Sequence, residues 1–223
     1  MVELIADLRA EQIRANLGRI REELAGAAAR SGRASSAVEV LAASKYLAVE
    51  DLPILAAGGV RLLGENRAQD LQAKFAAHGP LFEWDFIGQL QSRRVRAIVP
   101  LVRLIHSVAT DSALRELERH RDIARTDMRI LIEVNLAGDP AKAGIAPAEL
   151  DAFIERSSVP VAGLMTMPPL SKDAEDSRRW FAALHELAAE RGLEHLSMGT
   201  SQDYLVAAEE GATIVRIGTS LYR

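Results

Sequence analysis

Cysteine is absent from this 223-residue sequence, and aromatic residues make up only 4% of it. The absence of cysteine excludes disulfides, thiolate metal ligands and a cysteine nucleophile. With so few aromatic side chains, the core must consist mainly of leucine, isoleucine, valine and alanine, which suits helices packed on a buried parallel sheet. The net charge is -4, and no long basic run is present, so the sequence has no signature of nucleic-acid binding.

Long hydrophobic runs are also missing. No apolar stretch reaches the roughly 18 residues that span a bilayer, and the charged, amphipathic N-terminus lacks the apolar segment of a signal peptide. We therefore expect a cytoplasmic protein that contacts neither membrane nor nucleic acid. With 48% hydrophobic and 26% charged residues, the chain can form one sizeable core, but it is too short for two ordinary domains.

Short apolar or β-branched runs recur along most of the chain, and segments of helical periodicity lie between them. The runs are residues 38–43, 60–63, 86–87, 104–106, 130–134, 161–165, 195–198 and 214–217. The clearest helical segments are residues 112–124, 147–156, 176–191 and 202–210. This alternation, without hairpin signals, indicates parallel βαβ units. Eight units favour a single TIM-type (β/α)8 barrel. A doubly wound open sheet is the alternative, but no G-x-G-x-x-G follows the first predicted strand.

The first 30 or so residues carry apolar positions at helical spacing, which predicts one long amphipathic helix that ends near Ser31 and Gly32. We expect an N-terminal helix within residues 1–34 to pack on a barrel formed by residues 35–223, as one domain overall. The apolar stripe fits either a cover for the barrel bottom or a surface for dimerisation, so we expect a monomer or a weak dimer.

Lys45 directly follows the apolar run at residues 40–44, and we expect it at the barrel mouth with its stem among apolar neighbours. Partial desolvation or a nearby cation would favour the neutral amine, which can attack an aldehyde. The alternative is a surface lysine that only extends past the end of its strand.

Two glycine-rich loops follow the last two predicted strands: Gly199-Thr200-Ser201 and Gly218-Thr219-Ser220. TIM barrels often bind phosphate between these loops, where glycines allow close approach and hydroxyls donate hydrogen bonds. Ordinary turns and N-caps would explain either loop alone. Thr200 and Asp203 also have the spacing of a capping box at the start of the helix predicted over residues 202–210.

Arg216 lies on the eighth predicted strand, two residues before Gly218. A buried guanidinium needs a partner, and an ion pair with Glu133 or Glu65 would give it a purely structural role. The histidines lack the spacing of metal ligands, and the acidic residues form no recognisable acid–base pair.

Six short motifs occur in order along the chain. They are A-S-K at 43–45, G-E-N at 64–66, F-I-G-x-L-Q at 86–91, G-L-M-T-M at 163–167, S-M-G-x-S at 197–201 and V-R-I-G-T at 215–219. By this ordered set the sequence resembles the pyridoxal phosphate homeostasis proteins, the YggS/PROSC family. The resemblance implies a barrel like the N-terminal domain of alanine racemase, without the second, β-rich domain of the racemase.

The resemblance also implies a cofactor, pyridoxal 5'-phosphate, held as a Schiff base on Lys45. Arg216 would face its pyridine nitrogen. The residues implied to surround its phosphate are Ser201, Gly218 and Thr219, with Gly199 and Thr200 nearby. The other residues implied at the cofactor are Asn66 and Met165, which would line the ring pocket, and Ser197.

The sequence departs from the common family pattern at several positions. The departures are Tyr46 for threonine, Arg67 for an aromatic residue, Asp85 for histidine, Arg93 and Arg94 for Asn-Lys, and Thr200 for methionine. None of them alters Lys45, Arg216 or the final Gly-Thr, so the implied cofactor site stays complete.

A cationic arginine at the pyridine nitrogen disfavours protonation of that nitrogen, which makes the cofactor a weaker electron sink. Racemisation also needs a second acid–base group, which alanine racemase takes from the domain missing here. We therefore expect a carrier or reservoir in vitamin B6 homeostasis, with little or no catalysis and with apo pyridoxal-phosphate enzymes as partners. The alternatives are a pyridoxal-phosphate-dependent amino-acid racemase or related enzyme, and a Schiff-base aldolase.

Overall fold

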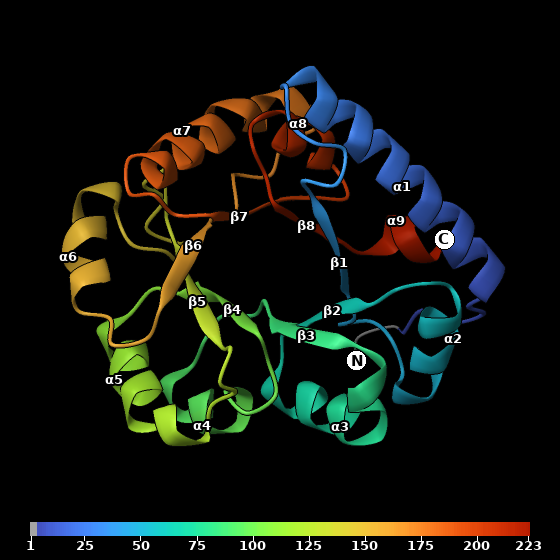
Figure 1. Cartoon of the computed structure of the whole chain (residues 1–223), viewed down its shortest axis with the longest axis horizontal. Helices are drawn as coiled ribbons and strands as arrows, with labels where there is room; N and C mark the ends of the chain where they lie inside the picture. Colours follow the sequence, from blue (N-terminus) through green and yellow to red (C-terminus); the bar gives the residue numbers. More distant parts are fainter. Residues whose placement is uncertain (1–3) are drawn as a thin grey trace.

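Eight parallel strands close into a barrel in the order β1 to β8, with β8 paired to β1 (Figure 1). The computed structural model describes residues 4–223. The strands are β1 (Glu39–Ala43), β2 (Leu62–Glu65), β3 (Glu83–Phe86), β4 (Leu104–Val108), β5 (Arg129–Glu133), β6 (Val161–Met165), β7 (His195–Thr200) and β8 (Ile214–Ile217). The predicted (β/α)8 barrel is confirmed.

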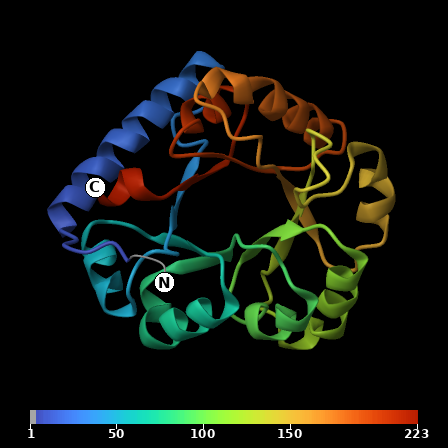
Figure 2. The same ribbon diagram turned by 180° about the vertical axis from the view of Figure 1, so that it is seen from behind.

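Helices surround the barrel in both opposite views (Figure 1, Figure 2). They are α1 (Ala10–Arg30), α2 (Leu52–Ala57), α3 (Ala68–His78), α4 (Val95–Ile98), α5 (Asp111–Arg119), α6 (Leu150–Glu155), α7 (Arg178–Ala189), α8 (Tyr204–Glu209) and α9 (Thr219–Tyr222). Within residues 4–223, none of them is both long and apolar enough to cross a bilayer.

The strands are buried on both faces, as the continuous apolar runs predict. One face of each strand packs under the helices. Side chains on the other face form a separate cluster in the barrel interior: Leu41, Leu62, Leu104, Leu131, Ala162, Met165 and Ile214. The strand edges differ from the prediction by a few residues. Strand β3 covers residues 83–86 rather than 86–87, because Trp84 and Asp85 pair with β2.

The N-terminal helix begins later than predicted, at Ala10. Residues 1–3 lie outside the described residues, and residues 4–9 are not helical. Asp7 has a φ of 59°, a left-handed backbone that does not continue a right-handed helix. The Ile5 side chain is buried, and its N–H donates to the carbonyl of Tyr46 at 2.9 Å. This contact with another segment replaces the hydrogen bonds of a helical turn.

Helix α1 lies in the outer ring beside α8 and α9, not across the bottom of the barrel (Figure 1). Because α9 has only four residues, α1 covers the side of the barrel where β8 meets β1. The hydroxyl of Tyr222 in α9 donates to the carbonyl of Ala43 at 3.0 Å, which ties the end of the chain to the end of β1.

Asn16 joins α1 to the last residues of the chain. Its Nδ2 donates to the carbonyls of Leu221 at 3.1 Å and Arg223 at 2.9 Å. We expect Asn16→Ala to lower the free energy of unfolding by about 1–2 kcal/mol, because two hydrogen bonds at a buried site are lost. Urea denaturation measures this. The exposed Glu22 of the same helix is the control, and Glu22→Ala should stay within about 0.5 kcal/mol of wild type. Equal losses in both variants would contradict the assignment.

Candidate functional site

A cavity of about 620 Å³ opens at the carboxyl ends of the barrel strands. The predicted cofactor residues that line it are Lys45, Asn66, Met165, Thr200, Ser201, Arg216, Gly218 and Thr219. The other two, Ser197 and Gly199, lie behind this wall. Strand ends that are far apart in the sequence therefore meet at one opening, as the barrel topology requires.

Lys45 follows β1 and lies at the mouth, but its side chain is exposed rather than enclosed by apolar neighbours. Its Nζ lies 4.6 Å from the centre of the Tyr46 ring, within the range of a cation–π contact. The amine is thus open to solvent and to small molecules that enter the cavity.

A buried ion pair fixes the backbone just before Lys45. Lys74 Nζ lies 2.6 Å from Glu65 Oε2 and also donates to the carbonyl of Ser44 at 2.6 Å. The Ser44 hydroxyl donates to the same carboxylate oxygen at 2.9 Å. Lys74 was not among the residues predicted from the sequence. The available signal was the acid of the G-E-N motif at a buried strand end, which requires a cation.

The two predicted phosphate loops are joined by hydrogen bonds. The Ser201 hydroxyl accepts from the Gly218 N–H at 3.2 Å and contacts the Ser220 hydroxyl at 2.9 Å. A Cβ added to Gly218 would meet nothing within 4 Å, so this backbone is accessible to a ligand. Gly199 has a different role. Its φ is +90°, and an added Cβ would lie 2.6 Å from the Cβ of Ala207, so it is needed for packing against α8.

Of the two reciprocal hydrogen bonds in the predicted capping box between Thr200 and Asp203, only the one accepted by the Asp203 side chain forms. Asp203 Oδ1 accepts from the N–H of Thr200 at 2.7 Å and from its hydroxyl at 3.0 Å. The Thr200 hydroxyl is therefore a donor to Asp203 and does not cap a helix N–H. The helix that follows, α8, begins at Tyr204 rather than at residue 202.

Arg216 is buried in the cavity wall and is held by uncharged acceptors. It donates to the carbonyl of Ser197 at 2.8 Å, to the Ser197 hydroxyl at 2.5 Å and to the carbonyl of Thr166 at 3.1 Å. The structural alternative of an ion pair with Glu133 or Glu65 is not formed.

Burial lowers the pKa of Arg216 to about 10, and the negative charges of Asp203 and Glu133 act against that shift. The guanidinium therefore stays cationic at neutral pH. Burial in turn raises the pKa of Glu133, and the charge of Arg216 opposes this effect. The cavity thus presents a cation whose charge no direct ion pair neutralises.

Asn66 supplies an unused acceptor. Its Oδ1 is buried and has no hydrogen-bond partner among the described residues, while its backbone N–H donates to Glu65 Oε1 at 2.8 Å. A buried polar atom without a partner is costly, and a bound ligand can supply one. Among residues 4–223, no group of three acidic or histidine side chains could hold a metal ion.

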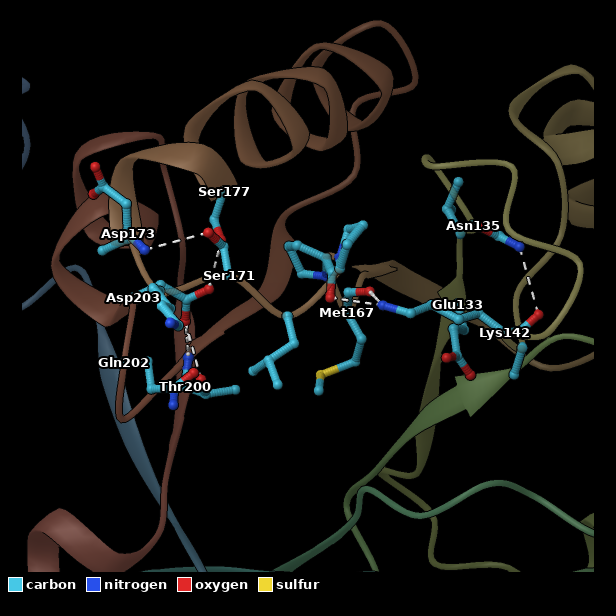
Figure 3. A pocket seen from close by; sticks show the side chains of 17 residues that line it. Glu133, Asn135, Lys142, Met167, Ser171, Asp173, Ser177, Thr200, Gln202 and Asp203 are labelled. Carbon is cyan, nitrogen blue, oxygen red and sulfur yellow. Dashed lines mark hydrogen bonds between the residues drawn. The ribbon is translucent and has the colours of Figure 1, made fainter.

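A second cavity of about 980 Å³ adjoins the first and is shown in Figure 3. The two share Glu133, Ala143, Met167, Thr200 and Gln202. Lys142 crosses towards the loop after β6 and donates to the carbonyl of Pro168 at 2.8 Å. The two cavities therefore meet on this side of the mouth.

Behind Arg216, buried polar side chains continue into the barrel. Ser197 contacts His106, and His106 contacts Asp85. The sequence analysis treated His106 only as a poor candidate for metal binding. Asp85 was the available signal, since an acid on a buried strand needs partners.

Comparison with known proteins agrees with this geometry. The model of the family "Alanine racemase, N-terminal domain" matches residues 9–223. The pyridoxal phosphate homeostasis protein of Aquifex aeolicus is 39% identical over 217 residues, which cover 92% of this chain and 95% of that protein. The protein of the same name from Vibrio cholerae is 34% identical over 224 residues, covering 94% and 95%.

Solved structures give the same result. PipY of Synechococcus elongatus, solved with PLP bound, superposes with a TM-score of 0.79 at 32% identity and covers 95% of this chain and 100% of its own. Alanine racemase of Corynebacterium glutamicum has a TM-score of 0.64 at 18% identity and shares the fold, with 61% of its chain covered. The molecule is thus a barrel of the alanine racemase N-terminal class. The chain belongs to the family of pyridoxal phosphate homeostasis proteins.

Proposed function

We propose that the protein binds pyridoxal 5'-phosphate at the barrel mouth, as a Schiff base on Lys45, and acts as a carrier or reservoir in cofactor homeostasis. The observation that carries this proposal is that one cavity brings together an exposed amine, a buried cation and two joined glycine-rich loops. The names of the relatives and the PLP bound to PipY support it.

The residues of the cavity fit this cofactor. Its volume of about 620 Å³ is in the range of small-molecule sites. Ser201, Gly218 and Thr219 would hold the phosphate. Arg216 would donate to the pyridine nitrogen, and the unpaired Oδ1 of Asn66 would gain a partner.

Attachment is a reversible condensation. Lys45 would supply the amine that condenses with the cofactor's aldehyde, with the loss of one water molecule. Because Lys45 is exposed at the mouth, water or a second amine can reach the same carbon and reverse the attachment. Ready release is what a carrier requires.

A hydrogen-bond donor at the ring nitrogen also favours the role of a carrier rather than that of a catalyst. The cofactor, when bound, supplies an electron sink for carbanions, and an unprotonated ring nitrogen weakens that sink. Arg216 is a cationic donor that lacks an accepting lone pair, so it does not stabilise a protonated nitrogen. Substantial amino-acid racemisation that Lys45→Ala abolishes would contradict the carrier role.

The wider setting of this function is also part of the proposal. Apo pyridoxal-phosphate enzymes would receive the cofactor in the cytoplasm, from a monomer or weak dimer. The N-terminal helical segment within residues 1–34 would stabilise the cofactor-binding barrel of residues 35–223 by covering one of its sides.

The visible absorption spectrum with added pyridoxal 5'-phosphate tests the attachment. We expect the wild type to show a Schiff-base band that borohydride removes, with the label on the peptide that contains Lys45. Lys45→Ala should lose the band completely. Lys142→Ala is the matched control, because this lysine lies at the adjoining cavity, and it should keep the band. A wild type without a band, or a label on Lys142, would contradict the proposal.

A further inference from the structure

A row of polar side chains crosses the barrel interior from the mouth to the opposite end. In order, its members are Arg216, Ser197, His106, Asp85, Arg103 and Glu39. They come from β8, β7, β4, β3, the residue before β4 and the start of β1. Ser197, His106 and Asp85 are each 0% exposed.

The direction of each hydrogen bond at the mouth end follows from the chemistry of the groups. Arg216 can only donate, so the Ser197 hydroxyl oxygen accepts from it at 2.5 Å. The Ser197 O–H is then free to donate to His106 Nδ1, which lies 2.8 Å away. A ring nitrogen that accepts carries no proton.

Asp85 determines the protonation of the other ring nitrogen of His106, Nε2. His106 Nε2 lies 3.1 Å from Asp85 Oδ2, and Arg103 Nε donates to Asp85 Oδ1 at 2.9 Å. An ionised carboxylate only accepts, so Nε2 must carry the ring proton. Both oxygens of Asp85 are used: Oδ1 accepts from Arg103 Nε, and Oδ2 accepts from His106 and, at 3.3 Å, from Arg103 Nη2.

The ring itself is neutral. Burial lowers the pKa of His106, and the positive charges of Arg216 and Arg103 lower it further, whereas the hydrogen bond and the charge of Asp85 act in the opposite direction. A neutral imidazole has one N–H, and the ring nitrogen that carries this proton determines which neighbouring residue receives the hydrogen bond.

We propose that Asp85 is a positioning residue for Arg216: it fixes the His106 tautomer and so leaves the Ser197 oxygen to hold the guanidinium at the cofactor's pyridine nitrogen. The contact between the guanidinium and the cofactor's pyridine nitrogen rests on the proposed function.

The substitution Asp85→Asn is expected to reverse the directions of the hydrogen bonds on both sides of the His106 ring. An amide has one acceptor oxygen, and the shorter of the two Arg103 contacts, from Nε at 2.9 Å, holds that oxygen at the position of Oδ1. The amide N–H then faces His106 Nε2, which must accept, so the ring proton moves to Nδ1. Nδ1–H then donates to the Ser197 oxygen, the Ser197 O–H must turn away from the ring, and the oxygen is shared between His106 and Arg216.

Nitrogen-15 NMR of the histidine rings tests the tautomer without any cofactor. We expect His106 to be the neutral Nε2–H form in the wild type and the Nδ1–H form in Asp85→Asn, with a His106→Gln sample to assign the signals. Glu39→Gln is the matched control. Its side chain is 49% exposed and bonds Arg103, one contact further away, so the tautomer should match wild type.

Either of two results would overturn the proposal. One is a wild-type His106 in the Nδ1–H or doubly protonated form, which needs no variant to fold. The other is a folded Asp85→Asn protein, checked by circular dichroism, that keeps the Nε2–H form.

Affinity measurements test the link to the cofactor. Pyridoxal 5'-phosphate is compared with its 1-deaza analogue, in which C–H replaces the ring nitrogen. We expect Asp85→Asn and Ser197→Ala to weaken binding of pyridoxal 5'-phosphate about tenfold, with little change for the analogue. Equal losses for both compounds would refute the link to the ring nitrogen. A wild type that binds neither compound contradicts the proposed function, and the NMR spectra still decide the tautomer.

Discussion

Lys74→Met is expected to lower the free energy of unfolding by about 3–5 kcal/mol, because it leaves a buried carboxylate without its cation. Lys74 is 3% exposed and Glu65 is 0% exposed, and their side chains are 2.6 Å apart. The same lysine also donates to the carbonyl of Ser44, so the variant loses two contacts beside the site. Urea denaturation at neutral pH, followed by circular dichroism, measures the change.

Two controls isolate the uncompensated charge. Glu65→Leu combined with Lys74→Met removes both charges, and it should recover much of the loss because no unpaired carboxylate is left. Lys172→Met makes the same change at an exposed lysine and should stay within about 0.5 kcal/mol of wild type. If Lys74→Met were as stable as Lys172→Met, the buried ion pair would not be the main contact that holds this end of β1.

Gly88→Ala is expected to lower stability by about 1–3 kcal/mol and to weaken cofactor binding. An added Cβ would lie 2.0 Å from the carbonyl oxygen of Asn66 and 2.6 Å from its Cα. Both are backbone atoms, so the clash moves the segment that carries Asn66 at the cavity wall. Thermal denaturation and titration with pyridoxal 5'-phosphate measure the two effects.

The same chemical change in an open position gives the control. A Cβ at Gly18 in α1 would meet nothing within 4 Å. Gly18→Ala should raise stability by up to about 1 kcal/mol, because alanine is the better helix former, and it should leave cofactor binding unchanged. A Gly88→Ala protein with wild-type stability and affinity would show that the segment at Asn66 can move aside at little cost.

The barrel could be predicted from the sequence because its signals are local and repeated. Each unit places an apolar run before a helical segment, and eight parallel units close in one way. The same rule predicts that Lys45, Arg216 and the two glycine loops meet at the mouth, since each directly follows or ends a strand. Strand edges were less accurate, as at β3, because pairing with neighbouring strands decides where a strand begins.

The contacts behind the site could not be predicted because they join residues distant in sequence. Ser197 and His106 are 91 positions apart, and His106 and Asp85 are 21 apart. No spacing rule links them; only the barrel register does. The exposure of Lys45 was missed for the same reason, since the openness of the mouth depends on the loops after β5 and β6.

The position of α1 has a consequence for the order of synthesis. This helix is synthesised well before α8 and α9, which pack against it. The pairing of β1 with β8 joins the first strand to the last in the same way. The apolar face of α1 therefore stays uncovered until α8 and α9 have been synthesised, and the barrel can close only once β8 is available to pair with β1.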